Sequence, residues 1–255
     1  MIRIKDKGQV TIFVIIAVVL AAGILMIFLF KKTPTISRGQ DFDNPESFID
    51  ECVRKSADET LKIMLPQGGF VEPKDYKLYE DIKVAYLCKN INDYEPCVNQ
   101  HPRFMFELQD ELSREIDDEV GQCFALLEEE LEKKNYAVSG GDISVESTLK
   151  PGVVEILINR EFEMKKGDFA RSFDKFNVFL RSAVYELAYL ANEISAQEAG
   201  LCYFSNDGYM ALYPQYDIKK DVMSDSTKIY SLKDKETQLT MNIAIRGCVV
   251  PLVGS

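Results

Sequence analysis

The cysteines and the single histidine are the residues of this chain with the most specific chemistry. The 255-residue sequence contains six cysteines and one histidine, His101. In an oxidising compartment six cysteines indicate three disulfides, whereas in a reducing cytoplasm they indicate thiols or metal ligands. Zinc held by Cys88, Cys97 and His101 is the competing interpretation, but the spacing lacks a close cysteine pair and a fourth ligand nearby. We expect no metal and no cofactor.

Recognisable catalytic motifs are absent from the sequence. Gly68-Gly69 and Gly140-Gly141 match neither phosphate-binding glycine pattern, and one histidine excludes an HExxH zinc motif. With 41 acidic residues, a carboxylate pair of the kind that hydrolyses glycosides remains open as an alternative. A net charge of −11 disfavours binding to nucleic acid, whose phosphates the protein would repel. We assign no catalytic residue.

Three long helices are predicted to form the frame of the domain. The first starts at Asn44-Pro45-Glu46, where a capping side chain precedes proline and an acid, and stops at Pro66 with Gly68-Gly69. Apolar residues three and four apart predict a second helix from about Phe106 to Lys134 and a third from about Arg181 to Ala199. We interpret the many acids of the second helix as a solvated face.

The remaining segments favour strands. Residues 78 to 88 predict one strand, and residues 143 to 162 predict a hairpin around Lys150-Pro151-Gly152. Phe169 to Leu180 fits a helix or a strand. Two further hairpins are expected around Asn206-Asp207-Gly208 and Asp234-Lys235-Glu236, and the alternation of Leu239 to Arg246 indicates a sheet covered on one face. Three main helices packed on antiparallel β-hairpins give an α+β fold.

These elements suggest how the cysteines pair. One pair brackets a short loop at a strand end, a second lies on the apolar faces of the first two helices, and a third lies in the late β section. Sequence order alone does not exclude the other pairings. The expected disulfides are Cys88–Cys97, Cys52–Cys123 and Cys202–Cys248.

An apolar segment near the N-terminus predicts a membrane anchor. No residue from Val10 to Phe30 is charged, and as a helix this segment spans about 30 Å, the thickness of the hydrocarbon core. A buried core helix is less consistent with apolar residues on every face. A cleavable secretory signal is disfavoured because the run exceeds about 15 residues and no small-residue cleavage site follows. The basic leader favours a cytoplasmic N-terminus, although Lys31 and Lys32 follow the span.

The residues before the apolar run carry a resemblance. Lys7-Gly8-Gln9 resembles the class III, type IV pilin-like signal peptide of archaeal membrane-anchored surface proteins. The resemblance implies that a prepilin peptidase cuts between Gly8 and Gln9, which leaves the apolar helix on the mature chain for anchoring or self-assembly. The chain has Phe13 where the family pattern has glutamate, so the resemblance favours anchoring over filament assembly. An ordinary uncleaved signal anchor is the alternative.

We therefore expect a single-pass cell-surface protein. Its divisions are a cytoplasmic leader (1–8), a transmembrane helix (9–32), a linker (33–44) and an extracellular α+β domain (45–255). Its expected partners are the lipid bilayer through Val10 to Phe30, a prepilin peptidase and further copies of itself, and its expected role is structural, adhesive or interactive. The alternatives are an anchored exported hydrolase that uses carboxylates and an envelope assembly factor.

Overall fold

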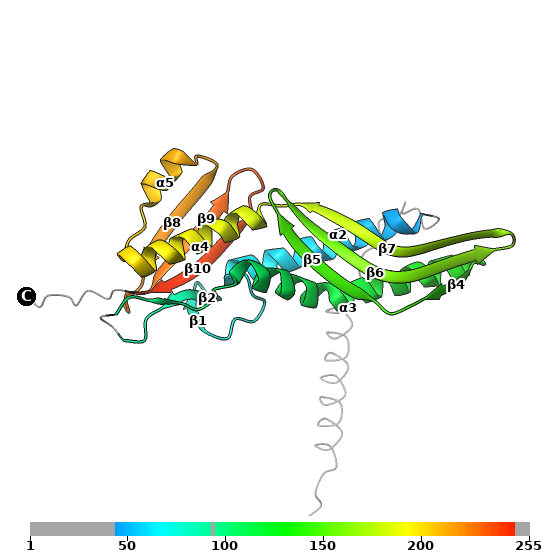
Figure 1. The fold of residues 1–255 in the computed structure, drawn as a ribbon, viewed down its shortest axis with the longest axis horizontal. Coiled ribbons are helices and arrows are strands. Elements are labelled where there is room, and N and C mark those ends of the chain that lie inside the picture. Colours follow the sequence, from blue (N-terminus) through cyan, green and yellow to red (C-terminus); the bar gives the residue numbers. More distant parts are fainter. Residues whose placement is uncertain (1–43, 93–94, 248–255) are drawn as a thin grey trace, which may run out of the picture. The chain divides into compact units, whose positions relative to one another are not determined.

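The computed structural model describes residues 44–92 and 95–247, all within one compact unit, Asp41–Ser255. The described residues form the α+β fold that the sequence predicts (Figure 1). In chain order the elements are α2 (Pro45–Met64), η1 (Leu65–Gln67), β1 (Tyr76–Tyr79), β2 (Ile82–Lys89), β3 (Val98–Asn99), α3 (Phe104–Lys133), β4 (Ala137–Gly140), β5 (Ser144–Lys150), β6 (Val153–Lys166), β7 (Phe169–Arg181), α4 (Val184–Leu201), α5 (Asn206–Leu212), β8 (Tyr216–Val222), β9 (Lys228–Asp234) and β10 (Thr240–Arg246).

The described strands form two sheets. One follows the order β1-β2-β10-β9-β8, with the short β3 also paired to β2. The other follows the order β4-β6-β5, with β7 paired to β6. Most neighbours are antiparallel, but β10 runs parallel to β2, from Ala244 beside Tyr86 to Arg246 beside Lys89. The expectation of antiparallel hairpins alone is therefore wrong, since a parallel pair joins the start and the end of the domain.

Helices α2 and α3 form an antiparallel pair alongside β5 and β7 (Figure 1). The apolar stripe that predicts α2 is buried, including Phe48, Ile49 and Leu61. The predicted stripe of α3 is likewise buried along its length. Pro45 occupies the first helical position of α2 as expected, but Asn44 makes no side-chain cap and its Oδ1 has no partner within residues 44–92 and 95–247. Burial of the apolar face, rather than the cap, therefore stabilises this helix.

Helix α4 packs against β2, β9 and β10. Its inward face joins a continuous core that also includes the stripes of α2 and α3. On the opposite face of the same sheet, Val84, Tyr86, Ile229 and Ala244 form a second apolar cluster. The expectation that the last strand is covered on one face is therefore wrong, because β10 lies in the middle of the sheet and both of its faces are buried.

The structure also corrects the local predictions. Around Asn206-Asp207-Gly208 the expected hairpin is the short helix α5, because Ser205 Oγ accepts the Gly208 N–H at 3.3 Å and acts as an N-cap. The predicted strand 78–88 is two strands, β1 and β2, which reverse at Glu80 and Asp81 with φ of 48° and 64°. Phe169 to Leu180 is strand, as part of β7, and the sequence did not predict β8.

The predicted leader, transmembrane helix and linker lie outside the described residues, apart from Asn44 at the end of the linker. Gly8, Gln9 and the segment Val10 to Phe30 therefore stay predictions. Within residues 44–92 and 95–247, no helix has both the length and the apolar composition that a membrane crossing requires.

Candidate functional site

Two of the expected disulfides are present. Cys52 and Cys123 join α2 to α3 across 71 residues of sequence, and Cys88 and Cys97 close the loop after β2 across 9 residues. Cys202 lies at the C-terminal end of α4 with φ of 56°, rather than in a β section as expected. Its predicted partner, Cys248, lies outside the described residues, so the Cys202–Cys248 disulfide stays a prediction.

The zinc interpretation of Cys88, Cys97 and His101 is wrong. The two sulfur atoms are bonded to each other, so neither is a thiolate that could bind zinc. The His101 ring lies 4.7 Å from the ring of Phe70, and its Nδ1 is 2.5 Å from Glu107 Oε2. Throughout the described part of the chain, no group of three or more histidine, cysteine or acidic side chains could hold a metal ion. His101 therefore contacts the first turn of α3 through Glu107.

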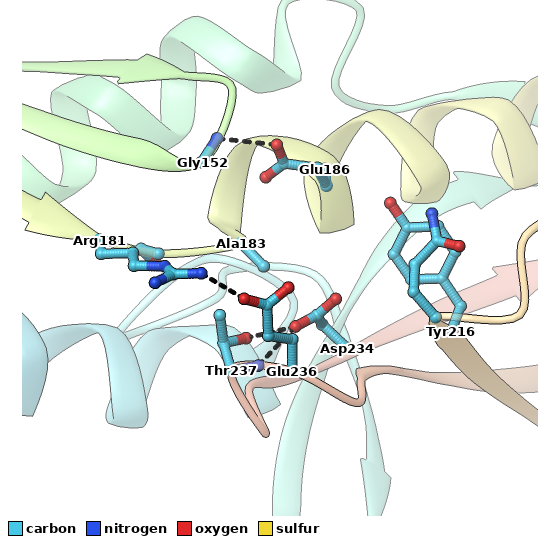
Figure 2. A pocket seen from close by; sticks show the side chains of 10 residues that line it. Gly152, Arg181, Ala183, Glu186, Tyr216, Asp234, Glu236 and Thr237 are labelled. Carbon is cyan, nitrogen blue, oxygen red and sulfur yellow. Dashed lines mark hydrogen bonds and ion pairs between the residues drawn. The ribbon is translucent and has the colours of Figure 1, made fainter.

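An open polar pocket of about 210 Å³ lies where the two sheets approach each other. Segments distant in the sequence supply its walls: the β5–β6 turn with Gly152, the end of β7 with Arg181, the start of α4 with Glu186, and the β9–β10 turn with Asp234 (Figure 2). The sequence predicts both turns, but no sequence signal shows that they face one pocket. We call these residues, with Gln215, Tyr216, Glu236 and Thr237, the junction pocket.

Three carboxylates line the junction pocket, and each is held by the chain itself. Asp234 Oδ1 accepts the Thr237 N–H at 2.7 Å, and Glu186 Oε1 accepts the Gly152 N–H at 2.8 Å. Glu236 forms an ion pair with Arg181, and both side chains are exposed (Figure 2). Glu186 Oε2 is buried and has no hydrogen-bond partner among the described residues. The pocket therefore presents fixed hydrogen-bond acceptors and one guanidinium group.

Tyrosines continue the surface beyond the junction pocket. The ring of Tyr209 lies 4.7 Å from that of Tyr213 and 6.2 Å from that of Tyr216, which lines the pocket. Burial raises the pKa of Tyr209, with a further contribution from the charge of Glu193. Burial also raises the pKa of Tyr216, although a hydrogen bond with Gln215 acts in the opposite direction. These phenols therefore stay protonated and neutral at physiological pH.

This combination of groups determines what the pocket can bind. Carboxylates are hydrogen-bond acceptors only, so they suit donor groups of a bound molecule, whereas the Arg181 guanidinium suits an acceptor. The adjoining phenol rings offer an apolar face together with a polar tip, which suits contact with amphipathic molecules and protein surfaces. The junction pocket therefore combines hydrogen-bonding groups with adjoining aromatic rings.

Comparison with known proteins adds no assignment. A scan against protein-family models, a search of curated proteins and a search of solved structures each found no match.

Proposed function

We propose that this protein is a membrane-anchored cell-surface protein whose disulfide-stabilised domain has a structural, adhesive or interactive role. The observation that carries the proposal is the Cys52–Cys123 disulfide, which links the two longest helices of the domain. Such a bond persists in an oxidising compartment and is rare in a reducing cytoplasm. Val10 to Phe30 supplies the anchor, and the Lys7-Gly8-Gln9 signal supplies the processing site.

The junction pocket supports an interactive role. Its carboxylates are oriented by backbone N–H groups and by a guanidinium, so they can discriminate between molecules without rearrangement. The exposed Tyr189 and Tyr213 lie near the more buried Tyr209. Tyrosine is enriched in protein recognition surfaces because its ring supplies contact area and its hydroxyl supplies a hydrogen bond.

Mass spectrometry of the mature protein from its native membrane tests the anchor and its processing. We expect an N-terminal peptide that starts at Gln9, complete protection of the cysteines from alkylation until a reductant is added, and retention in the membrane after alkaline extraction. Gly8→Leu should give an uncleaved chain in the same membrane fraction, whereas Gly141→Leu, a control distant from the signal, should be cleaved normally. Free thiols in the native sample, or a water-soluble full-length chain, would contradict the proposal.

A carboxylate-dependent exported hydrolase is the second candidate, and Glu186 is the observation that favours it. Its Oε2 is buried at the junction pocket with no partner in the part of the chain that the structure describes, and Asp234 lines the same pocket. Glycoside hydrolysis commonly uses a pair of carboxylates that flank one pocket. Under this alternative, Glu186→Gln and Asp234→Asn each abolish hydrolysis of a glycoside substrate while the melting temperature changes little. Under the interactive role, the wild-type protein hydrolyses none of the substrates in such a screen.

A further inference from the structure

The β6–β7 hairpin ends beside the start of the domain. Its end, residues 165–171, comprises the last residues of β6, a turn at Gly167 and the first residues of β7. Arg171 of this hairpin end pairs with Glu46 in the first turn of α2 at 3.4 Å. Figure 1 shows the hairpin tip and the start of α2 at the same end of the helix pair. The hairpin end therefore lies close to the point where the chain enters the domain.

The composition of the hairpin end differs from that of the whole protein. Residues 165–171 contain three basic residues, Lys165, Lys166 and Arg171, and one acid, Asp168, in a chain whose net charge is −11. Lys165 Nζ also lies 3.0 Å from Glu163 Oε1 in the preceding part of β6. The Phe169 side chain is 49% exposed although it is large and apolar.

The hairpin end also adjoins an aromatic ring of the preceding segment. The ring of Tyr136 contacts Phe169 edge-on at 6.4 Å, and Lys166 Nζ lies 4.9 Å from the centre of the Tyr136 ring. Aromatic rings combined with lysines are the side chains that favour the boundary between lipid headgroups and acyl chains.

The length of the linker restricts how far this end can lie from the membrane. Residues 31–44 lie between the apolar run and α2 in the sequence, and a segment of this length reaches at most about 50 Å. Helix α3 is 30 residues long, which corresponds to about 45 Å. The chain therefore enters the domain at the end that carries Glu46 and the hairpin end, and the start of α3 lies at the other end of the helix pair.

We propose that the hairpin end lies against the lipid headgroups of the anchoring membrane, with Phe169 at the headgroup boundary and Lys165 and Lys166 beside anionic phosphates. The proposal rests on the anchored function proposed above. Each lysine near an anionic surface adds attraction that falls off within a Debye length. The contact would set the orientation of the domain on the membrane and direct the distal face, with the start of α3, outward.

Tryptophan fluorescence tests the contact directly, because the chain contains no tryptophan. The full-length Phe169→Trp protein is reconstituted in phosphatidylcholine vesicles with and without phosphatidylglycerol, and lipids with a nitroxide-labelled headgroup serve as the quencher. Phe106→Trp is the matched control, because Phe106 is 55% exposed in the first turn of α3, at the other end of the helix pair. We expect the Phe169→Trp protein to lose about half of its emission, most strongly with the anionic lipid, and the Phe106→Trp protein to lose none.

Charge reversal separates specific contact from chance proximity. Lys166→Glu in the Phe169→Trp background should reduce the quenching about two-fold in anionic vesicles, while Lys219→Glu on the exposed side of β8 should leave it unchanged. A protein that floats with the vesicles but shows equal quenching at positions 169 and 106 overturns the hairpin contact alone. A protein that does not float with the vesicles overturns the anchor as well.

Discussion

Ser113 Oγ in α3 accepts a hydrogen bond of 2.7 Å from the backbone N–H of Ser147 in β5. One turn earlier, Gln109 Oε1 accepts the Leu149 N–H at 2.9 Å. On the other side of the same sheet, Arg54 of α2 donates to the carbonyl oxygen of Phe179 in β7. Helix side chains thus occupy free backbone groups of two outer strands, β5 and β7, which hinders their pairing with another chain.

Removal of the α3 side chains should expose the edge of β5. The double variant Gln109→Ala/Ser113→Ala leaves two backbone N–H groups without their partners, and we expect it to lower the free energy of unfolding by about 2 kcal/mol. It should also aggregate faster on heating. Urea unfolding and light scattering measure the two effects, with the exposed Gln122→Ala in the same helix as the control. A variant as stable and as soluble as the control would refute this role.

The two confirmed disulfides should contribute unequally to the free energy of unfolding. In the chain-entropy model, the Cys52–Cys123 bond, with its separation of 71 residues, stabilises the fold by about 4 kcal/mol. The Cys88–Cys97 bond, with a separation of 9 residues, stabilises it by about 3 kcal/mol. Paired cysteine-to-alanine replacements followed by urea unfolding should therefore cost more for the first pair. The reverse order would show that strain or packing, not loop length, determines the contribution.

Tyr230 and Glu198 form a buried polar contact that should be costly to break. Glu198 is 1% exposed, Tyr230 is fully buried and donates its hydroxyl hydrogen to Glu198 Oε1, and Lys228 Nζ lies 2.5 Å from Glu198 Oε2. Tyr230→Phe removes one donor and keeps the ring, so we expect a loss of about 1 to 3 kcal/mol in thermal or urea unfolding. Tyr203→Phe, at an exposed tyrosine, should cost much less.

Tyr230 should also make the stability of the fold decrease at alkaline pH. Burial, and then the hydrogen bond with Glu198, raises the pKa of Tyr230 far above its ordinary value of 10.0. The folded state keeps the Tyr230 proton at a pH where the unfolded state loses it. The contribution of Tyr230 to the free energy of unfolding is therefore complete below pH 10, and it falls by about 1.4 kcal/mol per pH unit above that. Urea unfolding from about pH 8 to about pH 11 measures the slope. Tyr230→Phe should show a shallower decline, and identical slopes would contradict the assignment.

Gly69 should tolerate no side chain. Its φ is 95°, and an added Cβ would lie 2.2 Å from Leu108 Cδ2 in the core. Gly69→Ala combines backbone strain with overpacking, so we expect a loss of about 2 to 4 kcal/mol. Gly152→Ala isolates the backbone cost, since its φ is 74° and nothing lies within 4 Å of the added Cβ. Equal losses for the two variants would show that the contact with Leu108 is unimportant.

Local patterns in the sequence predict the parts of the fold that local physics determines. The three long helices follow from apolar residues that repeat with the helical period, and Lys150-Pro151-Gly152 marks a hairpin turn. The Cys52–Cys123 pair follows from two cysteines on apolar helix faces. The hairpin predicted at Asn206-Asp207-Gly208 is wrong because these residues suit both a β-turn and the first turn of a helix. The preceding Ser205 favours the helix.

The sequence does not determine which strands and segments distant along the chain lie side by side. Whether Leu239 to Arg246 is covered on one face or two depends on its neighbours, and the parallel pairing with β2 has no local signal. The sequence likewise does not predict the junction pocket, because Gly152 and Asp234 come from separate hairpins that meet only when the two sheets pack together. Function at such a site depends on tertiary structure that periodicity does not encode.

The central position of β10 has a consequence for biogenesis. This strand comes last among the described elements, yet it separates β2 from β9. The first sheet thus cannot be completed while the ribosome or a translocase still holds the C-terminal residues. The pairing of β2 with β9 through β10 therefore forms only late in synthesis, after residue 246 has been released.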